Sequence, residues 1–113
     1  MSTSAAPAQN EEPPWKVSFT SRAEKQKEKL PANMKARLLV LVTELKLEGP
    51  IQKEWKNFGK LAGSQKKEVY HCHLNSGRPT YVVIWEVKDR DAQVIKIVYD
   101  GTHEKAHYNH YVS

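Results

Sequence analysis

Three histidines in this sequence stand where they could share acid–base chemistry. His71 and His73 are two residues apart within residues 68–74, a stretch with the composition of a β-strand. Side chains alternate between the faces of a strand, so both imidazoles should lie on one face, and the other face should be core: Tyr70, Cys72 and Leu74. An imidazole has an ordinary pKa of about 6.5 and is suited to proton transfer near neutral pH. The competing interpretation is a pair of surface histidines without a chemical role.

His103 is the third candidate, two residues after Gly101 and just past the last long predicted strand. The end of that strand should lie near the middle of a three-stranded meander. His103 would then be close to other strands of the sheet, whereas the alternative is a plain loop histidine.

A metal site built from histidines is a weaker hypothesis. His71, Cys72 and His73 have ligand chemistry, but neighbouring strand residues point to opposite faces and cannot easily bind one ion. The other metal site considered would use His103, His107 and His110, which would share one face of a helix. That segment lacks a clear apolar stripe, and the sequence has no phosphate loop, serine elbow or paired-carboxylate motif. We therefore expect no metal and no other cofactor.

The charge of the chain favours a polyanionic partner without requiring one. The 113 residues have a formal net charge of +5, and residues 1–14 contribute only two acidic charges. Residues 53–67 contain five lysines and one glutamate. Such a basic domain can bind nucleic acid or an acidic protein through charge. A solvated, soluble surface is an equally good explanation of charge alone.

Other features of composition bear on location and domain organisation. Cys72 is the only cysteine, so no intramolecular disulfide can form, which fits a reducing compartment. No apolar run approaches the roughly 20 residues that span a bilayer, and the N-terminus does not have the pattern of a secretory signal. We expect a cytoplasmic protein with a disordered tail over residues 1–14 and one domain over residues 15–113.

The apolar pattern predicts an α+β domain with the order β-α-α-β-β-β. Ser21 and Glu24 suggest a capping box at the start of the first helix, and Asn33 can cap the second, which ends at Gly49 and Pro50. The expected elements are a strand at 15–20, helices at 21–30 and 34–48, and strands at 68–74, 80–88 and 93–99. Short connections require the last three strands to form an antiparallel meander. We expect an N-terminal strand and helical hairpin packed on a curved antiparallel sheet, with its other face at least partly free.

This order and three local motifs resemble the RelE/ParE superfamily, the toxins of bacterial type II toxin–antitoxin systems. The motifs are Tyr70-His71-Cys72-His73-Leu74, the strand from Tyr81 to Val87, and the segment from Gly101 to Tyr108 with His103 inside it. Leu61-Ala62-Gly63 stands where the family often has Leu-x-Gly. The resemblance covers residues 15–108 and is carried by the order and spacing of the motifs together.

The resemblance implies an endoribonuclease that cleaves messenger RNA. Resemblance to the RelE branch further implies that cleavage takes place in the ribosomal A site. A ribose 2′-hydroxyl can attack the adjacent phosphorus if a base, an acid and cations assist, and no metal is needed. His71 or His73 as base and His103 as acid would supply these parts, and the sequence leaves open which histidine takes which role. Tyr108 matches the family's closing tyrosine, which could stack on a base or orient a proton. The RNA-binding cations would be Lys60, Lys66, Lys67 and Arg78, with residues 53–67 on 16S ribosomal RNA.

Two departures from the family pattern leave alternatives open. Many RelE-type toxins have lysine or arginine at the positions of His71 and His73, and many have arginine where Val82 stands; Arg78 is a candidate substitute. A ParE-like protein that binds DNA gyrase without catalysis is one alternative, and a degenerate toxin that only binds its antitoxin is another. The resemblance implies a cognate antitoxin as partner, with an acidic or amphipathic segment that covers the basic surface.

Overall fold

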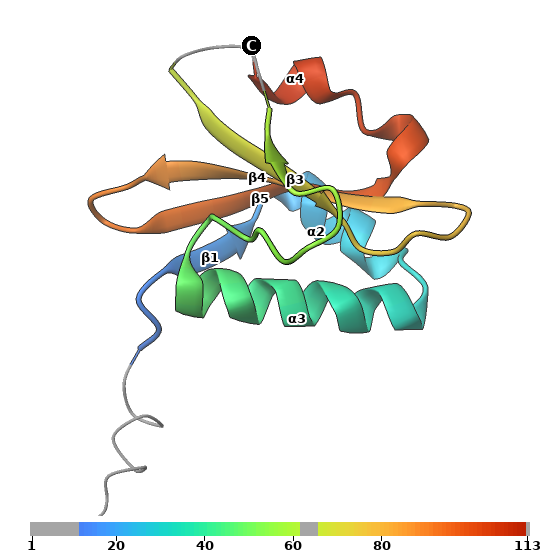
Figure 1. Cartoon of the computed structure of the whole chain (residues 1–113), viewed down its shortest axis with the longest axis horizontal. Coiled ribbons are helices and arrows are strands. Elements are labelled where there is room, and N and C mark those ends of the chain that lie inside the picture. Colours follow the sequence, from blue (N-terminus) through green and yellow to red (C-terminus); the bar gives the residue numbers. More distant parts are fainter. Residues whose placement is uncertain (1–11, 62–65, 113) are drawn as a thin grey trace, which may run out of the picture.

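The computed structural model describes residues 12–61 and 66–112 (Figure 1). Most of the predicted tail, residues 1–11, therefore lies outside the described residues, as do Ala62 and Gly63 of the predicted Leu-x-Gly motif. The elements follow in the order β1 Lys16–Phe19, α2 Ser21–Glu28, α3 Ala32–Glu48, β2 Gly59–Lys60, β3 Glu68–His73, β4 Tyr81–Asp89, β5 Val94–Thr102, the 3-10 helix η1 His103–Lys105 and α4 Tyr108–Val112. No helix within the described ranges is long and apolar enough to cross a membrane.

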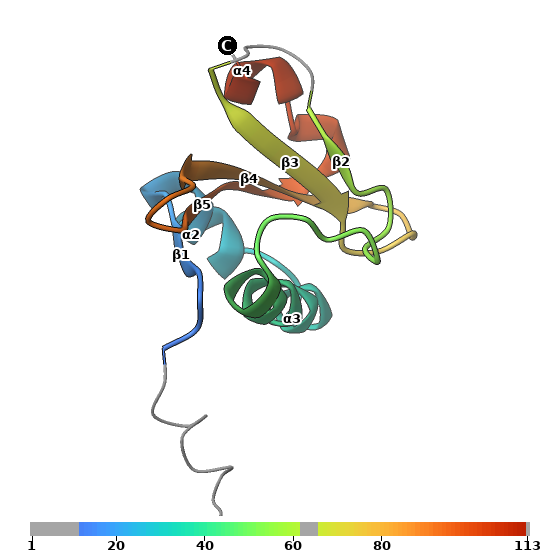
Figure 2. The same ribbon diagram turned by 60° about the vertical axis from the view of Figure 1, so that its left-hand side comes forward.

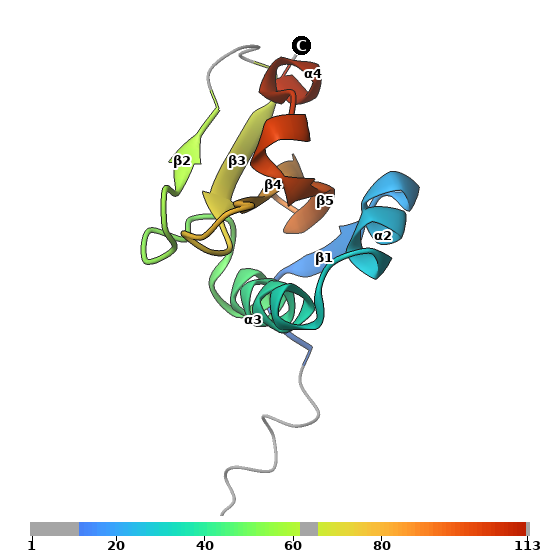
Figure 3. The ribbon, with the colours of Figure 1, turned by 90° about the vertical axis from the view of Figure 1, so that its right-hand side faces the viewer.

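One five-stranded sheet organises the chain in the order β1-β5-β4-β3-β2. The predicted meander is confirmed, because β3 pairs antiparallel with β4 and β4 with β5. The sheet is nevertheless mixed, since β1 pairs parallel to β5 at one edge. The other edge is the two-residue strand β2, which lies between the predicted helix at 34–48 and the predicted strand at 68–74, where no element was predicted. Figure 3 shows β1 and β2 on opposite sides of the meander.

Helix α3 packs its apolar stripe against one face of the sheet. The buried side chains repeat with helical spacing: Met34, Leu38, Leu41, Val42 and Leu45. The helix begins after Pro31, so the expected cap at Asn33 is wrong. It ends at Gly49, where φ is 95° and a Cβ would lie 2.8 Å from Trp15 Nε1. Only glycine fits this helix end without strain and without displacing Trp15.

Helix α2 begins one residue earlier than the predicted capping box. Its N-cap is Thr20, whose hydroxyl accepts a hydrogen bond from the Ala23 amide at 3.1 Å. Ser21 is therefore the first helical residue. Ala23 is fully buried, so α2 lies against the sheet through a small side chain.

The C-terminal segment covers part of the face opposite α3. Ala106 and Val112 are buried in a second apolar cluster with Val69, Val82 and Ile84. Figure 2 shows α4 and α3 on opposite sides of the sheet. The predicted free face is therefore only partly free, and β4 has apolar clusters on both of its faces.

Asp100 lies on the other face of β5, next to α2: it pairs with Val83, and its amide donates a hydrogen bond to Gln26 Oε1 at 3.1 Å. Its side chain is fully buried, and neither carboxylate oxygen has a hydrogen-bond partner among the described residues. Burial raises the pKa of this carboxyl from 3.8 to about 8. Between about pH 4 and pH 8, the unfolded chain has released the proton while the folded chain retains it. Asp100 therefore reduces stability progressively as the pH rises through this window.

We predict that Asp100→Asn removes this pH dependence. At pH 8.5 the variant should have a free energy of unfolding about 1–3 kcal/mol above the wild type, because a buried ionised group is absent. At pH 5 the two proteins should differ little. Urea denaturation at both pH values measures the effect, and Asp91→Asn in the exposed turn is the control. Parallel stability curves for wild type and Asp100→Asn would contradict the prediction.

Candidate active site

Strand register brings His73 and His103 together. His73 pairs with Val82 of β4, and Val82 pairs with Gly101 of β5, so one row of residues crosses three strands. His103 follows two residues later, and its amide donates a hydrogen bond to Thr80 O at 2.8 Å. The two imidazole centroids are 5.5 Å apart. The pair thus stands at the end of β5, within reach of a single small group.

Gly101 allows the Tyr99 side chain to lie close against the backbone just before His103. A Cβ at this position would lie 2.8 Å from Tyr99 Oη. The Tyr99 hydroxyl donates a hydrogen bond to Thr102 O at 2.7 Å across the glycine. The turn into η1 is therefore held by the tyrosine ring, which needs a residue without a side chain beneath it.

Tyr108 completes a cluster of the four predicted catalytic residues. Its ring centroid is 5.3 Å from that of His71 and 6.0 Å from that of His103. His71 and His73 come from β3, His103 from η1 and Tyr108 from α4. The two elements beyond β5 therefore fold back over the histidine face of β3.

His71 is the inner member of the cluster. It is half-buried between Tyr108 and β2, and a Cβ at Gly59 would lie 3.4 Å from its Nε2. Its Nδ1 and the Tyr108 hydroxyl are both buried without a hydrogen-bond partner among the described residues. Burial, then the charges of His73 and His103, lower the pKa of His71. Burial raises the pKa of Tyr108. Both groups are therefore neutral at pH 7.

His73 and His103 are the outer members. His103 is exposed, and His73 is partly exposed. Partial burial, then the charges of His103 and Lys56, lower the pKa of His73. A neutral His73 can accept a proton from a substrate at pH 7, and the solvent position of both rings suits them to act on a polymer.

A hollow of about 330 Å³ opens beside this outer pair. Its lining includes His73, Arg78, Pro79, Thr80, Thr102, His103 and Glu104. Arg78 is exposed in the β3–β4 loop, so the structure brings this predicted cation to the histidines. Besides the two imidazoles, the hollow offers a guanidinium, two hydroxyl groups and the carboxylate of Glu104 around the same opening.

A second hollow, of about 350 Å³, also borders His73, and its lining includes two basic and two acidic residues: Arg37, Lys56, Glu44 and Glu54. Arg37 of α3 lines it, and its guanidinium donates a hydrogen bond to Leu74 O at 2.8 Å. Lys56 also lines it, and its carbonyl accepts from the His73 amide at 2.8 Å. Lys56 belongs to the lysine-rich stretch 53–67, and that stretch is the sequence signal that could have identified it. Arg37 lies on the polar side of a helix, where no local pattern marks it.

The three other predicted RNA-binding lysines do not line either hollow. Lys60 pairs with Tyr70, so its side chain belongs to the face opposite the histidines. Lys66 and Lys67 come just before the first residue of β3, and His73 is its last residue. The two lysines are therefore about 20 Å from His73, measured along the strand. Leu61, the described residue of the Leu-x-Gly motif, packs against the second apolar cluster.

The C-terminal histidines do not share one helical face. His107 has a φ of 41° and separates η1 from α4, so the i, i+4, i+7 arrangement considered from the sequence is wrong. His110 instead contacts the ring of Tyr111. Within residues 12–61 and 66–112, no group of three or more potential ligands is placed to hold a metal ion.

Comparisons with known proteins establish the fold. No protein-family model matches the chain, and no curated protein matches it in sequence. A chain of the archaeal RelE–RelB complex from Pyrococcus horikoshii is similar, with 24% identity, 82% of this chain and 99% of that chain covered, and a TM-score of 0.66. A free double mutant of the E. coli toxin RelE has 21% identity over 87% and 92% of the two chains, with a TM-score of 0.64. The isolated E. coli RelE toxin has 21% identity over 86% and 93%, with a TM-score of 0.58. The chain therefore has the fold of the RelE toxins, as its motifs predicted.

We predict that the histidines of the cluster titrate together. In an NMR titration, the pKa values of His71 and His73 should both lie below the ordinary value. His103→Gln should raise both, because it removes a positive charge that opposes their protonation. His110→Gln is the control, since His110 does not lower the pKa of either residue. Unchanged titration of His71 and His73 in His103→Gln would show that the three rings are not coupled.

Proposed function

We propose that this protein is the toxin of a toxin–antitoxin system and acts as a metal-independent endoribonuclease on messenger RNA. The observation that carries the proposal is the pairing of His73 and His103, 5.5 Å apart beside the Arg78 hollow, in a domain with the RelE fold. Two imidazoles and an arginine are the parts that cleavage of RNA by its own 2′-hydroxyl requires.

The outer histidines divide the proton transfers. One imidazole takes the proton of the ribose 2′-hydroxyl as its oxygen bonds to phosphorus. The other gives a proton to the 5′-oxygen as its bond to phosphorus breaks, which leaves a 2′,3′-cyclic phosphate. The lowered pKa of His73 keeps its imidazole neutral and favours it as base, and His103 is the proposed acid. Arg78 and Lys56 lie where positive charge can offset that of the phosphorane.

The inner pair has a supporting role in this scheme. His71 and Tyr108 contact each other and are largely withdrawn from solvent. Tyr108 also contacts His103. The ring of Tyr108 thus limits how the His103 side chain can rotate. The ring of His71 packs against Tyr108.

Messenger RNA on the ribosome and an antitoxin are the proposed partners. The similar archaeal structure is described as a RelE–RelB complex, which supports a protein partner here. The lysines of residues 53–67 would contact 16S ribosomal RNA, with Lys60, Lys66 and Lys67 outside the cleavage site itself. The protein would act in the cytoplasm, where its substrate is translated.

A binding function without catalysis is the second candidate. Val82 stands where many RelE-type toxins have arginine, and here it is fully buried in the second apolar cluster on the histidine face. A gyrase-binding protein, or one that binds only an antitoxin, would not need the histidine pair.

Induced expression tests the proposal. We predict that the wild type arrests growth and produces new 5′ ends within translated frames, detected by primer extension. His103→Ala should reduce these ends by at least about a hundredfold, which is the usual contribution of an acid–base group. His110→Ala should act like the wild type. Arrest without new ends would favour the gyrase alternative, and no arrest would favour a protein that only binds its antitoxin.

We predict a second contrast, between the arginine beside the histidines and a lysine on the opposite face. Arg78→Gln should lower the cleavage rate of messenger RNA in a translation extract by about tenfold to a hundredfold, because one charge beside the phosphate is lost. Lys60→Gln removes only one of the several lysines proposed to contact ribosomal RNA outside the cleavage site, and it should lower the rate less than about threefold. Equal losses would mean that the two faces of the sheet do not differ in their contact with RNA.

A further inference from the structure

Helix α3 has apolar side chains on the side that faces away from the sheet. Among the described residues, the large hydrophobic side chains exposed to solvent are Leu39 at 66%, Val40 at 50%, Leu47 at 59% and Ile51 at 43%. Three belong to α3, and the fourth lies just after it. Apolar side chains gathered in this way on one exposed helix mark an interaction surface.

The exposed side of α3 has the spacing of a helix–helix contact. Ala36, Val40, Thr43 and Leu47, called the seam below, follow one another at intervals of four, three and four residues, and all four are exposed. With 3.6 residues per turn, these positions stand opposite the buried stripe of the helix. The Thr43 hydroxyl donates a hydrogen bond to Leu39 O at 2.9 Å, so it can be covered without losing a partner. The seam therefore has the spacing and the chemistry by which one helix packs along another.

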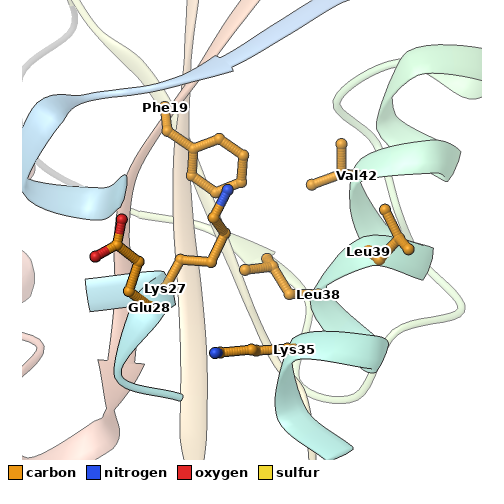
Figure 4. A pocket seen from close by; sticks show the side chains of 7 residues that line it. All are labelled: Phe19, Lys27, Glu28, Lys35, Leu38, Leu39 and Val42. Carbon is orange, nitrogen blue, oxygen red and sulfur yellow. The ribbon is translucent and has the colours of Figure 1, made fainter. Parts of the chain in front are cut away.

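Helix α2 borders a different side of α3. A groove of about 290 Å³ separates the two helices, and its lining from α3 includes Lys35, Leu38, Leu39 and Val42 (Figure 4). Helical spacing places these residues between the buried stripe and the seam. Leu39 stands where the groove meets the exposed side of the helix. The seam is therefore a surface distinct from the groove.

The side chains that flank the seam make it complementary to itself. On one flank stand Arg37 and, two turns later, Glu44; on the other flank stand Leu39 and Lys46. When two identical helices pair antiparallel about a two-fold axis, the first half of each lies beside the second half of the other. Arg37 of each copy then meets Glu44 of the other, and Leu39 meets the aliphatic part of Lys46.

We propose that α3 pairs antiparallel with α3 of a second copy of this chain and forms a two-fold symmetric dimer. Ala36 of one copy packs beside Leu47 of the other, and Val40 beside Thr43. The paired length is about 16 Å, which is short for an interface of about 800 Å² per partner, so the dimer is reversible and forms at micromolar concentrations. Nucleic acid is a poor occupant, because the seam has no charged side chain. A helix of another protein could cover the seam, but it need not reproduce the match of Arg37 with Glu44.

The position of the seam separates the dimer from the proposed cleavage site. Helix α3 lies on one side of the sheet, whereas His71, His73 and His103 lie on the side of α4 (Figure 2). The dimer would therefore present two histidine clusters that face away from each other. Pairing through α3 does not depend on the proposed ribonuclease activity, and loss of one leaves the other unaffected.

Sedimentation velocity of the full-length protein tests the dimer. Between about 5 and 500 µM, the wild type should pass from monomer to dimer. Val40→Glu should weaken this association by at least about tenfold, because it buries a carboxylate against the seam of the second copy. Asn109→Glu adds the same charge to α4, on the other side of the sheet, and should change the association by less than about twofold.

Charge reversal distinguishes a second copy from any other occupant. Arg37→Glu and Glu44→Arg each place like charges together twice in a two-fold dimer, and each should weaken association by at least about fivefold. The double variant restores opposite charges and should associate to within about twofold of the wild type. Loss of folding cannot produce this recovery, because the double variant lacks the internal hydrogen bonds that Arg37 makes to Leu74 O and that Glu44 accepts from Trp55.

Cross-linking tests the antiparallel direction. A short bismaleimide should join two copies of Thr43→Cys, since these positions lie about 5 Å apart along the paired helices. It should not join two copies of Ala36→Cys, which lie about 16 Å apart along them, and Cys72 is fully buried. The proposal is overturned if the protein stays monomeric throughout the concentration range, if Val40→Glu associates like the wild type, or if the double charge reversal fails to restore association. Equal cross-linking of the two cysteine variants would also overturn it.

Discussion

Burial of β4 on both of its faces is the constraint on which the rest of the structure depends. Val82, Val83, Ile84 and Trp85 are four consecutive residues without solvent exposure, and they alternate between the two apolar clusters. A slip of one residue would exchange every side chain between the clusters, so the register with β3 and β5 is strongly determined. That register places Val82 between His73 of β3 and Gly101 of β5, and His103, two residues after Gly101, therefore comes close to His73.

The two faces of the sheet have different chemistry. The α3 face is closed by a large apolar cluster, in which Trp85 donates its indole N–H to Pro50 O at 3.1 Å. The opposite face combines a small apolar cluster with the histidines. Two buried polar atoms there, His71 Nδ1 and the Tyr108 hydroxyl, have no partner among the described residues. A buried polar group without a partner reduces stability, so this face is less completely satisfied than an apolar core would be.

Cations reach the histidines from elements that are distant in the chain. Arg37 comes from α3, Lys56 from the loop before β2, and Arg78 from the β3–β4 loop. All three lie near the end of β3 that carries His73. Three acidic residues, Glu44, Glu54 and Glu104, line the same two hollows, so the charges around the histidines are mixed. The lysines of residues 53–67 are spread along the sheet. They therefore suit contact with a larger polyanion better than contact with one phosphate.

Local periodicity by itself determined the meander, the α3 stripe and the common face of His71 and His73. These features depend on the alternation of side chains within single elements and on short connections. Other features depended on contacts between distant segments, which no local pattern encodes. They include the parallel pairing of β1 with β5, the return of residues 103–112 over the histidine face, and the location of Lys60 on the opposite face. Tertiary packing decided these, because each requires an apolar surface that exists only after the sheet has formed.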